Sequence, residues 1–108
     1  MEILWERSQK NVLITAHGGY NSGMMSFNSI IGFEAAVHAG ADIVELDVLR
    51  SAEGKLYNFH PGTEMAMLHK ACDLRKMTNA EIEQQRIASN GLPIPTLDEV
   101  FEVLKGRC

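Results

Sequence analysis

Two carboxylates and two histidines are the residues of this sequence best suited to chemistry. Glu45 and Asp47 lie two positions apart in an apolar segment, and His17 and His60 each stand at the end of a short apolar segment. Segments of this length and composition are typical of buried β-strands. In parallel barrels, side chains at the carboxyl ends of strands face the active-site mouth. We therefore expect these four side chains to converge.

The carboxylate pair has two interpretations. Residues two apart on a strand point to one face, so Glu45 and Asp47 would lie side by side. Two adjacent carboxylates repel each other and are costly to desolvate, and a divalent cation such as Mg²⁺ or Ca²⁺ removes both costs. On an exposed edge strand the same residues would be two solvated acids. Residues Val44, Leu46 and Val48 are expected on the opposite face.

The histidines also have two interpretations. Imidazole titrates near neutral pH, so one ring can accept a proton while the other donates one. Taken alone, His17 or His60 is better explained as a side chain satisfied by a nearby carbonyl. Together with the carboxylate pair, the catalytic hypothesis is favoured. We expect His38 to be structural and assign no role to His69.

The surrounding pattern predicts an α/β fold with a parallel sheet. Strands are expected at residues 11–16, 41–48 and 56–60. Helices are expected at residues 1–9, from a cap at Asn28 or Ser29 to Gly40, after a cap at Thr78, and from a capping box at Thr96 to Gly106. About eight residues join the second and third strands, whereas parallel crossovers take a dozen or more. Either a helix is missing there or this pair is antiparallel.

Composition excludes several classes of protein. Hydrophobic residues make up 45% of the 108 residues, and the net charge is −4. This balance suits one globular domain and argues against nucleic acid or an anionic membrane as a partner. No apolar run approaches the ~20 residues of a membrane span. The N-terminus has no signal-peptide pattern, and Cys72 and Cys108 match no metal-ligand spacing, so we expect a cytoplasmic protein with free thiols.

Methionines and glycines near these segments suggest a binding pocket. The methionines can line an apolar pocket for a lipid-like substrate, although such residues more often fill gaps. Glycines after the first strand can bring backbone amides close to a phosphate. The residues concerned are Met24, Met25, Met65, Met67, Met77, Gly18, Gly19 and Gly23.

Five segments, in order, resemble the glycerophosphodiester phosphodiesterase family. Residues 14–19 resemble the strand end with the family's histidine-arginine-glycine motif, and residues 28–36 resemble the helix after its proline-glutamate-asparagine-threonine motif. Residues 40–48 are similar to its metal-binding strand, residues 54–60 to the strand of its second histidine, and residues 94–100 to the segment before its next helix. The resemblance extends over most of the chain.

The resemblance implies a TIM barrel, of which this single domain, residues 1–108, would hold the first three strands, with an insertion at residues 62–91. It implies that His17 and His60 are an acid–base pair and that Glu45 and Asp47 bind Mg²⁺ or Ca²⁺. The implied reaction is hydrolysis of a glycerophosphodiester to an alcohol and glycerol phosphate. One histidine would take a proton from the nucleophile, and the other would protonate the leaving alkoxide.

Three positions depart from the family's pattern. Gly18 stands where the family has arginine, Phe27 where it has a glutamate near the metal, and Pro61 where it has an aspartate after the second histidine. These changes weaken phosphate binding and the charge balance of a metal site. Two alternatives therefore stay open: a non-catalytic binding or assembly module, and a phospholipase D-like diester enzyme of the same superfamily.

The length of the chain also matters. A TIM barrel takes about 250 residues, and the family's third metal-binding glutamate lies on a strand that this sequence does not contain. Because the sequence begins with a methionine and an expected helix, we place the missing part at the C-terminus. Three strands would leave sheet edges and apolar faces uncovered. We expect either a longer parent chain or self-association to cover them.

Overall fold

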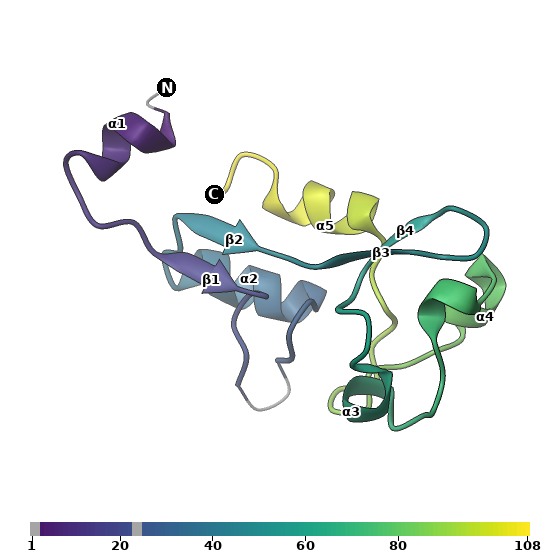
Figure 1. Cartoon of the computed structure of the whole chain (residues 1–108). Helices are drawn as coiled ribbons and strands as arrows, with labels where there is room; N and C mark the ends of the chain where they lie inside the picture. Colours follow the sequence, from purple (N-terminus) through teal and green to yellow (C-terminus); the bar gives the residue numbers. More distant parts are fainter. Residues whose placement is uncertain (1–2, 23–24) are drawn as a thin grey trace.

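Strands and helices alternate as far as β2, after which two further strands are followed by a run of short helices and α5. A computed structural model describes residues 3–22 and 25–108. The elements in order are α1 (Leu4–Ser8), β1 (Thr15–His17), α2 (Ile30–His38), β2 (Ile43–Glu45), β3 (Val48–Arg50), β4 (Leu56–Asn58), α3 (Glu64–Leu68), the 3₁₀ helix η1 (Leu74–Lys76), α4 (Asn79–Glu83) and α5 (Leu97–Leu104). Helix α2 lies beside β1 and β2, and α5 packs on α2 and contacts β4, whereas α3 and α4 lie at the end of the molecule away from α1 (Figure 1).

The strands form two small sheets rather than one. Strands β1 and β2 are parallel, with His17 opposite Glu45, whereas β3 and β4 are antiparallel, with Leu49 opposite Tyr57. The short connection between the second and third predicted strands is therefore a hairpin, which is the antiparallel alternative. The predicted strand 41–48 is divided in two, because the chain leaves β1 after Glu45 and pairs with β4 from Val48 onward.

This change of partner corrects one expectation about side-chain direction. Val44 and Leu46 pack on the core as predicted. Val48, expected on the same face, is instead 41% exposed, while the next residue, Leu49, is only 3% exposed. The reason is that residues 46–47 belong to neither strand, so the alternation of β2 does not continue into β3.

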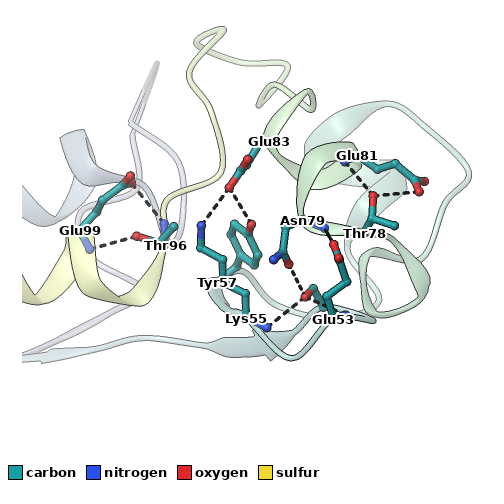
Figure 2. Close-up of polar contacts among 10 residues, drawn as sticks. Glu53, Lys55, Tyr57, Thr78, Asn79, Glu81, Glu83, Thr96 and Glu99 are labelled. Atoms are coloured by element: carbon teal, nitrogen blue, oxygen red, sulfur yellow. Dashed lines mark hydrogen bonds and ion pairs between the residues drawn. The ribbon is translucent and has the colours of Figure 1, made fainter.

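Helices α2 and α5 begin at the predicted caps. The Ser29 hydroxyl accepts a hydrogen bond from the Gly32 amide at 3.1 Å. Thr96 and Glu99 form a reciprocal capping box, which Figure 2 shows. These caps satisfy amides that have no partner within the helix. The two helices meet in a core of Phe33, Val100 and Leu104, against which β2 packs.

A second core lies under the β3–β4 hairpin. Leu49, Tyr57 and Phe59 from the hairpin pack with Leu68, Leu74, Ile82 and Ile94 from the segment after it. Polar contacts also hold this segment. The backbone amide of Asn79 donates to the Glu53 carboxylate at 2.6 Å, and the Glu83 carboxylate accepts from Lys55 and Tyr57 (Figure 2). The segment predicted to be an insertion, 62–91, contains only short helices, which explains its weak periodicity.

Element ends differ from prediction by a few residues. The first strand covers Thr15–His17 rather than 11–16, and the third ends at Asn58 rather than residue 60. Helix α1 is Leu4–Ser8, and the first two residues of the predicted helix lie outside the described residues. In the described parts of the chain, no helix is long and apolar enough to cross a membrane.

Candidate active site

Three of the four predicted site residues line one cavity. His17 at the end of β1, Asp47 after β2 and His60 after β4 surround a cavity of about 210 Å³. The remaining lining residues are Phe27, Asn28, Phe59, Thr63 and Met67. Glu45 is not among the lining residues, but its carboxylate contacts His17. Strand ends far apart in the sequence therefore converge here, as the pattern predicts.

The parallel pairing of β1 and β2 sets the His17–Glu45 contact. Because the two residues are partners in register, the Glu45 Oε2 atom lies 3.6 Å from His17 Nε2. The same oxygen accepts a hydrogen bond from the Gly18 amide at 3.1 Å. A carboxylate at this position suits an imidazole that carries a proton on Nε2.

Asn28 positions Asp47 through two hydrogen bonds. Its amide nitrogen donates to Asp47 Oδ2 at 3.0 Å, and its amide oxygen accepts from the Asp47 backbone amide at 2.9 Å. Asn28 is buried and has a φ of 59°, a left-handed conformation that asparagine tolerates better than most residues. The backbone carbonyl of Asn28 accepts a hydrogen bond from the Asn58 side-chain amide at 2.9 Å. Asp47 is thereby fixed to the wall of the cavity.

The His60 ring is oriented by the backbone that follows it. Its Nδ1 atom lies 2.8 Å from the Pro61 carbonyl oxygen. A carbonyl can only accept, so Nδ1 is the donor in this contact, and the neutral tautomer that fits it has its lone pair on Nε2. The Thr63 hydroxyl donates to the His60 carbonyl at 2.7 Å and holds the turn. In this geometry His60 can accept a proton through Nε2.

Comparisons with known proteins identify the family of this chain. The sequence profile of the glycerophosphoryl diester phosphodiesterase family matches residues 17–107. This chain belongs to that family. It is 33% identical to a glycerophosphodiester phosphodiesterase of Bacillus altitudinis over 100 residues, which cover 87% of this chain and 40% of the relative. The chain therefore spans well under half the length of this relative.

Solved structures of family members confirm the predicted fold. The crystal structure of a glycerophosphodiester phosphodiesterase from Agrobacterium tumefaciens has 30% sequence identity and a TM-score of 0.81, over 91% of this chain and 44% of that one. A phosphodiesterase from Oleispira antarctica, solved in complex with the product sn-glycerol-3-phosphate, has 27% identity and a TM-score of 0.75, over 86% and 40% of the two chains. The chain is part of a TIM barrel, as the family resemblance implies.

The departures from the family's pattern have a structural basis at one end of the cavity. The Phe27 and His17 rings have centroids 5.6 Å apart and are tilted by 51°. A Cβ atom on Gly18 would lie 2.5 Å from Phe27 Cδ1. The phenyl ring therefore occupies the space that a side chain at position 18, where the family resemblance predicts arginine, would need. Pro61, where the resemblance predicts aspartate, contacts His60 through its backbone carbonyl.

The arrangement of the Glu45 and Asp47 carboxylates meets only some of the requirements of a divalent-cation site. Glu45 turns toward Gly18 and His17, whereas Asp47 turns toward Asn28, and each has an oxygen engaged by a donor. Among residues 3–22 and 25–108, no three His, Cys, Asp or Glu residues are grouped to hold an ion. Mg²⁺, however, commonly takes one or two carboxylates, with water and substrate phosphate completing its shell. The oxygen donors present are compatible with such a site.

Two further expectations can be checked. The Gly18 amide donates to Glu45 and the Gly19 amide to the Ala16 carbonyl, so the expectation that they face a phosphate is wrong. Their acceptors were not visible in the sequence. Gly23 and Met24 lie outside the described residues. Of the other methionines named as pocket candidates, Met67 lines the cavity and Met77 packs on the second core.

Sequence reasoning identified Asn28 only as a helix cap and missed its role beside Asp47. The cap is Ser29, and Asn28 lies one residue earlier. The signal was its alignment with the asparagine of the family motif, next to the position where Phe27 replaces glutamate. His38 contacts Glu34 at 3.7 Å on an exposed face of α2, apart from the cavity.

Proposed function

We propose that this chain supplies His17, His60 and Asp47 to a site that hydrolyses glycerophosphodiesters to an alcohol and glycerol phosphate. The observation that carries the proposal is the single cavity in which two histidines from different strand ends face a positioned carboxylate. Family membership supports the reaction class, and a family neighbour was solved with sn-glycerol-3-phosphate as its product.

The two histidines suit opposite proton transfers. Water attacks phosphorus, a P–O bond forms to the water oxygen, and the P–O bond to the alcohol breaks. We assign His60 as the acceptor of the water proton, because the Pro61 carbonyl engages Nδ1 and leaves Nε2 for this role in the neutral ring. We assign His17, beside Glu45, as the donor to the leaving alkoxide. The sum is one water consumed and one alcohol and one phosphomonoester released.

We assign Glu45 and Asp47 as the ligands of a divalent cation, Mg²⁺ or Ca²⁺, whose charge would polarise the phosphoryl oxygens. Asn28 would hold Asp47 in place for this role. The two carboxylates leave several coordination positions to water and phosphate. A third carboxylate from outside this chain would complete the charge balance.

We further propose that the site works only when the rest of the barrel is supplied, by a longer chain or by a second copy. Val12 and Ile14, just before β1, are 86% and 58% exposed, so the apolar surface that leads into this strand is uncovered. The composition and the two free cysteines, Cys72 and Cys108, are consistent with action in the cytoplasm.

The test is release of glycerol phosphate from glycerophosphocholine by the purified chain, with Mg²⁺, Ca²⁺ or chelator. Metal-dependent turnover that is lost in His60→Ala and Glu45→Gln is expected if the chain assembles a site. Turnover that persists in both variants would exclude the assignment. Calorimetry of Mg²⁺ or Ca²⁺ with wild type and Glu45→Gln tests the metal site without requiring activity.

The alternative is a binding module without catalysis, or a related enzyme of phospholipase D type. The packing of Phe27 over Gly18 favours these alternatives, because the family resemblance predicts a charged side chain at each of these two positions. Binding of glycerol phosphate without turnover would support the module. Release of choline from a lysophospholipid in preference to glycerophosphocholine would support the related enzyme.

A further inference from the structure

Phe27 lines the cavity and packs over Gly18. Gly18 has a φ of 68°, which side chains rarely adopt, and a Cβ there would collide with the Phe27 ring at 2.5 Å. The ring in turn lies against the His17 imidazole, with centroids 5.6 Å apart. Phe27 lines the cavity and is 39% exposed, so part of its surface is accessible to a ligand. A ligand bound in the cavity beside His17 can therefore also contact this ring.

The wall next to Phe27 is also hydrocarbon. Phe59 and Met67 line the same cavity, and Phe59 is almost fully buried beneath it. No lysine or arginine is among the described lining residues, whose polar members are His17, Asn28, Asp47, His60 and Thr63. A group attached to a phosphate held between the histidines would therefore meet aromatic and thioether surface on this side. Such a surface favours apolar groups, because their area is removed from contact with water on binding.

We propose that Phe27 is a specificity-determining residue that selects diesters whose alcohol is aromatic or apolar over diesters whose alcohol is hydroxylated. This inference rests on the proposed function, because it concerns the same cavity, and it adds the chemical class of the alcohol. A phenyl or alkyl group gains by burial against Phe27, Phe59 and Met67. A glyceryl group would place hydroxyls against surface that offers them no partner.

The experiment compares two diesters that differ in one alcohol, the phenyl ester and the glyceryl ester of glycerol phosphate. Both carry the same charge and the same glycerol phosphate moiety. Binding is followed by proton NMR titration of the chain in Mg²⁺, and phosphorus NMR of the same samples reports any hydrolysis. The phenyl ester is expected to bind on the order of tenfold more tightly, the gain for burying part of one ring.

Variants assign the preference to Phe27. Phe27→Ala should bring the two dissociation constants to within about twofold of each other, whereas Phe27→Leu should retain part of the preference. Phe101→Ala is the matched control, because this aromatic side chain is 54% exposed on α5 and does not line the cavity. If Phe27→Ala loses its dispersed NMR spectrum, Phe27→Leu and Phe27→Gln provide the same comparison at similar volume.

The outcomes separate this inference from the proposed function. A phenyl preference that depends on Phe27, without hydrolysis of either ester, would support the inference and count against catalysis by this chain. Hydrolysis of both esters with equal affinities would support catalysis and overturn the inference. Equal dissociation constants, failure of both esters to bind, or a preference unchanged in Phe27→Ala would each overturn it.

Discussion

Asn28 and Asp47 exchange two hydrogen bonds, at 3.0 Å and 2.9 Å, across the segment where the chain passes from one sheet to the other. Asp47 lies between β2 and β3, and Asn28 precedes α2. The contact therefore joins three elements at the cavity wall. It fixes the carboxylate proposed to hold a metal and satisfies a backbone amide that neither sheet pairs.

Replacing Asn28 by alanine should destabilise the fold by about 2–4 kcal/mol, because both hydrogen bonds are lost and the backbone stays in a left-handed conformation. Asn28→Gly loses the same hydrogen bonds but relaxes the backbone. It should therefore be more stable than Asn28→Ala by about 1 kcal/mol. Urea unfolding of the three proteins measures both differences. A stability of Asn28→Ala within 0.5 kcal/mol of wild type, on the order of an ordinary surface change, would contradict this role.

Gly18 offers a second test, because two separate effects act there. Gly18→Ala places a Cβ 2.5 Å from Phe27 and also imposes a positive φ on alanine. Gly62→Ala is the matched control: its φ is 92°, but no atom lies within 4 Å of the added Cβ. The control should lose about 1 kcal/mol from backbone strain alone.

Gly18→Ala should lose about 1–3 kcal/mol more than the control, since Phe27 must move to make room. Thermal or urea unfolding gives the comparison. Introducing Phe27→Ala together with Gly18→Ala should recover part of the excess, and equal losses at Gly18 and Gly62 would show that Phe27 is not packed there.

The approach of His17 to the Glu45–Asp47 segment could be predicted from sequence, because both follow neighbouring parallel strands, whose carboxyl ends share one edge. His60 reaches the same cavity by a different route, since it follows β4 of the antiparallel hairpin. The caps at Ser29 and Thr96 were likewise readable, since each depends on one local side chain. The division of the predicted strand 41–48 could not be predicted in this way. An alternating run of apolar residues does not indicate that the chain changes its pairing partner from β1 to β4 within the run, and this change accompanies the tertiary contact of Asp47 with Asn28.

The packing of Phe27 over Gly18 could also not be predicted from the sequence. Loss of the arginine and of the glutamate read as two separate defects, whereas in the structure one side chain occupies the space of the other. The insertion boundaries, residues 62–91, the metal and the roles of the two histidines stay predictions. They depend on groups that lie outside the chain or on chemistry that geometry alone does not test.

Glu83 should contribute to stability in a pH-dependent way. Hydrogen bonds from Lys55 and Tyr57 hold the pKa of Glu83 below its ordinary value of 4.5. The folded state thus prefers the charged form, so this contribution is present above the ordinary pKa. It is lost as pH falls through the lowered folded pKa.

Glu83→Gln should therefore be less stable than wild type near neutral pH, with the difference shrinking as pH falls below about 4. Urea unfolding of both proteins between neutral and acid pH gives the profile. Glu102→Gln, on the exposed side of α5, is the control and should run parallel to wild type. A difference between Glu83→Gln and wild type that is the same at every pH would show that the contact is not ionic.

The uncovered flank of β1 predicts association through that surface. Ile14, just before β1, is 58% exposed, and among residues 3–22 and 25–108 this strand pairs only with β2. Unpaired strand edges and exposed apolar side chains recruit a further strand or chain. If this chain associates with itself to cover the flank, Ile14→Lys should shift it toward monomer by placing a charge in the contact. Met65→Lys, at an equally exposed position on α3, should not. Sedimentation velocity over a concentration series measures the mass. A wild-type chain that stays a stable monomer throughout the series would contradict the prediction, and so would equal effects of the two lysines.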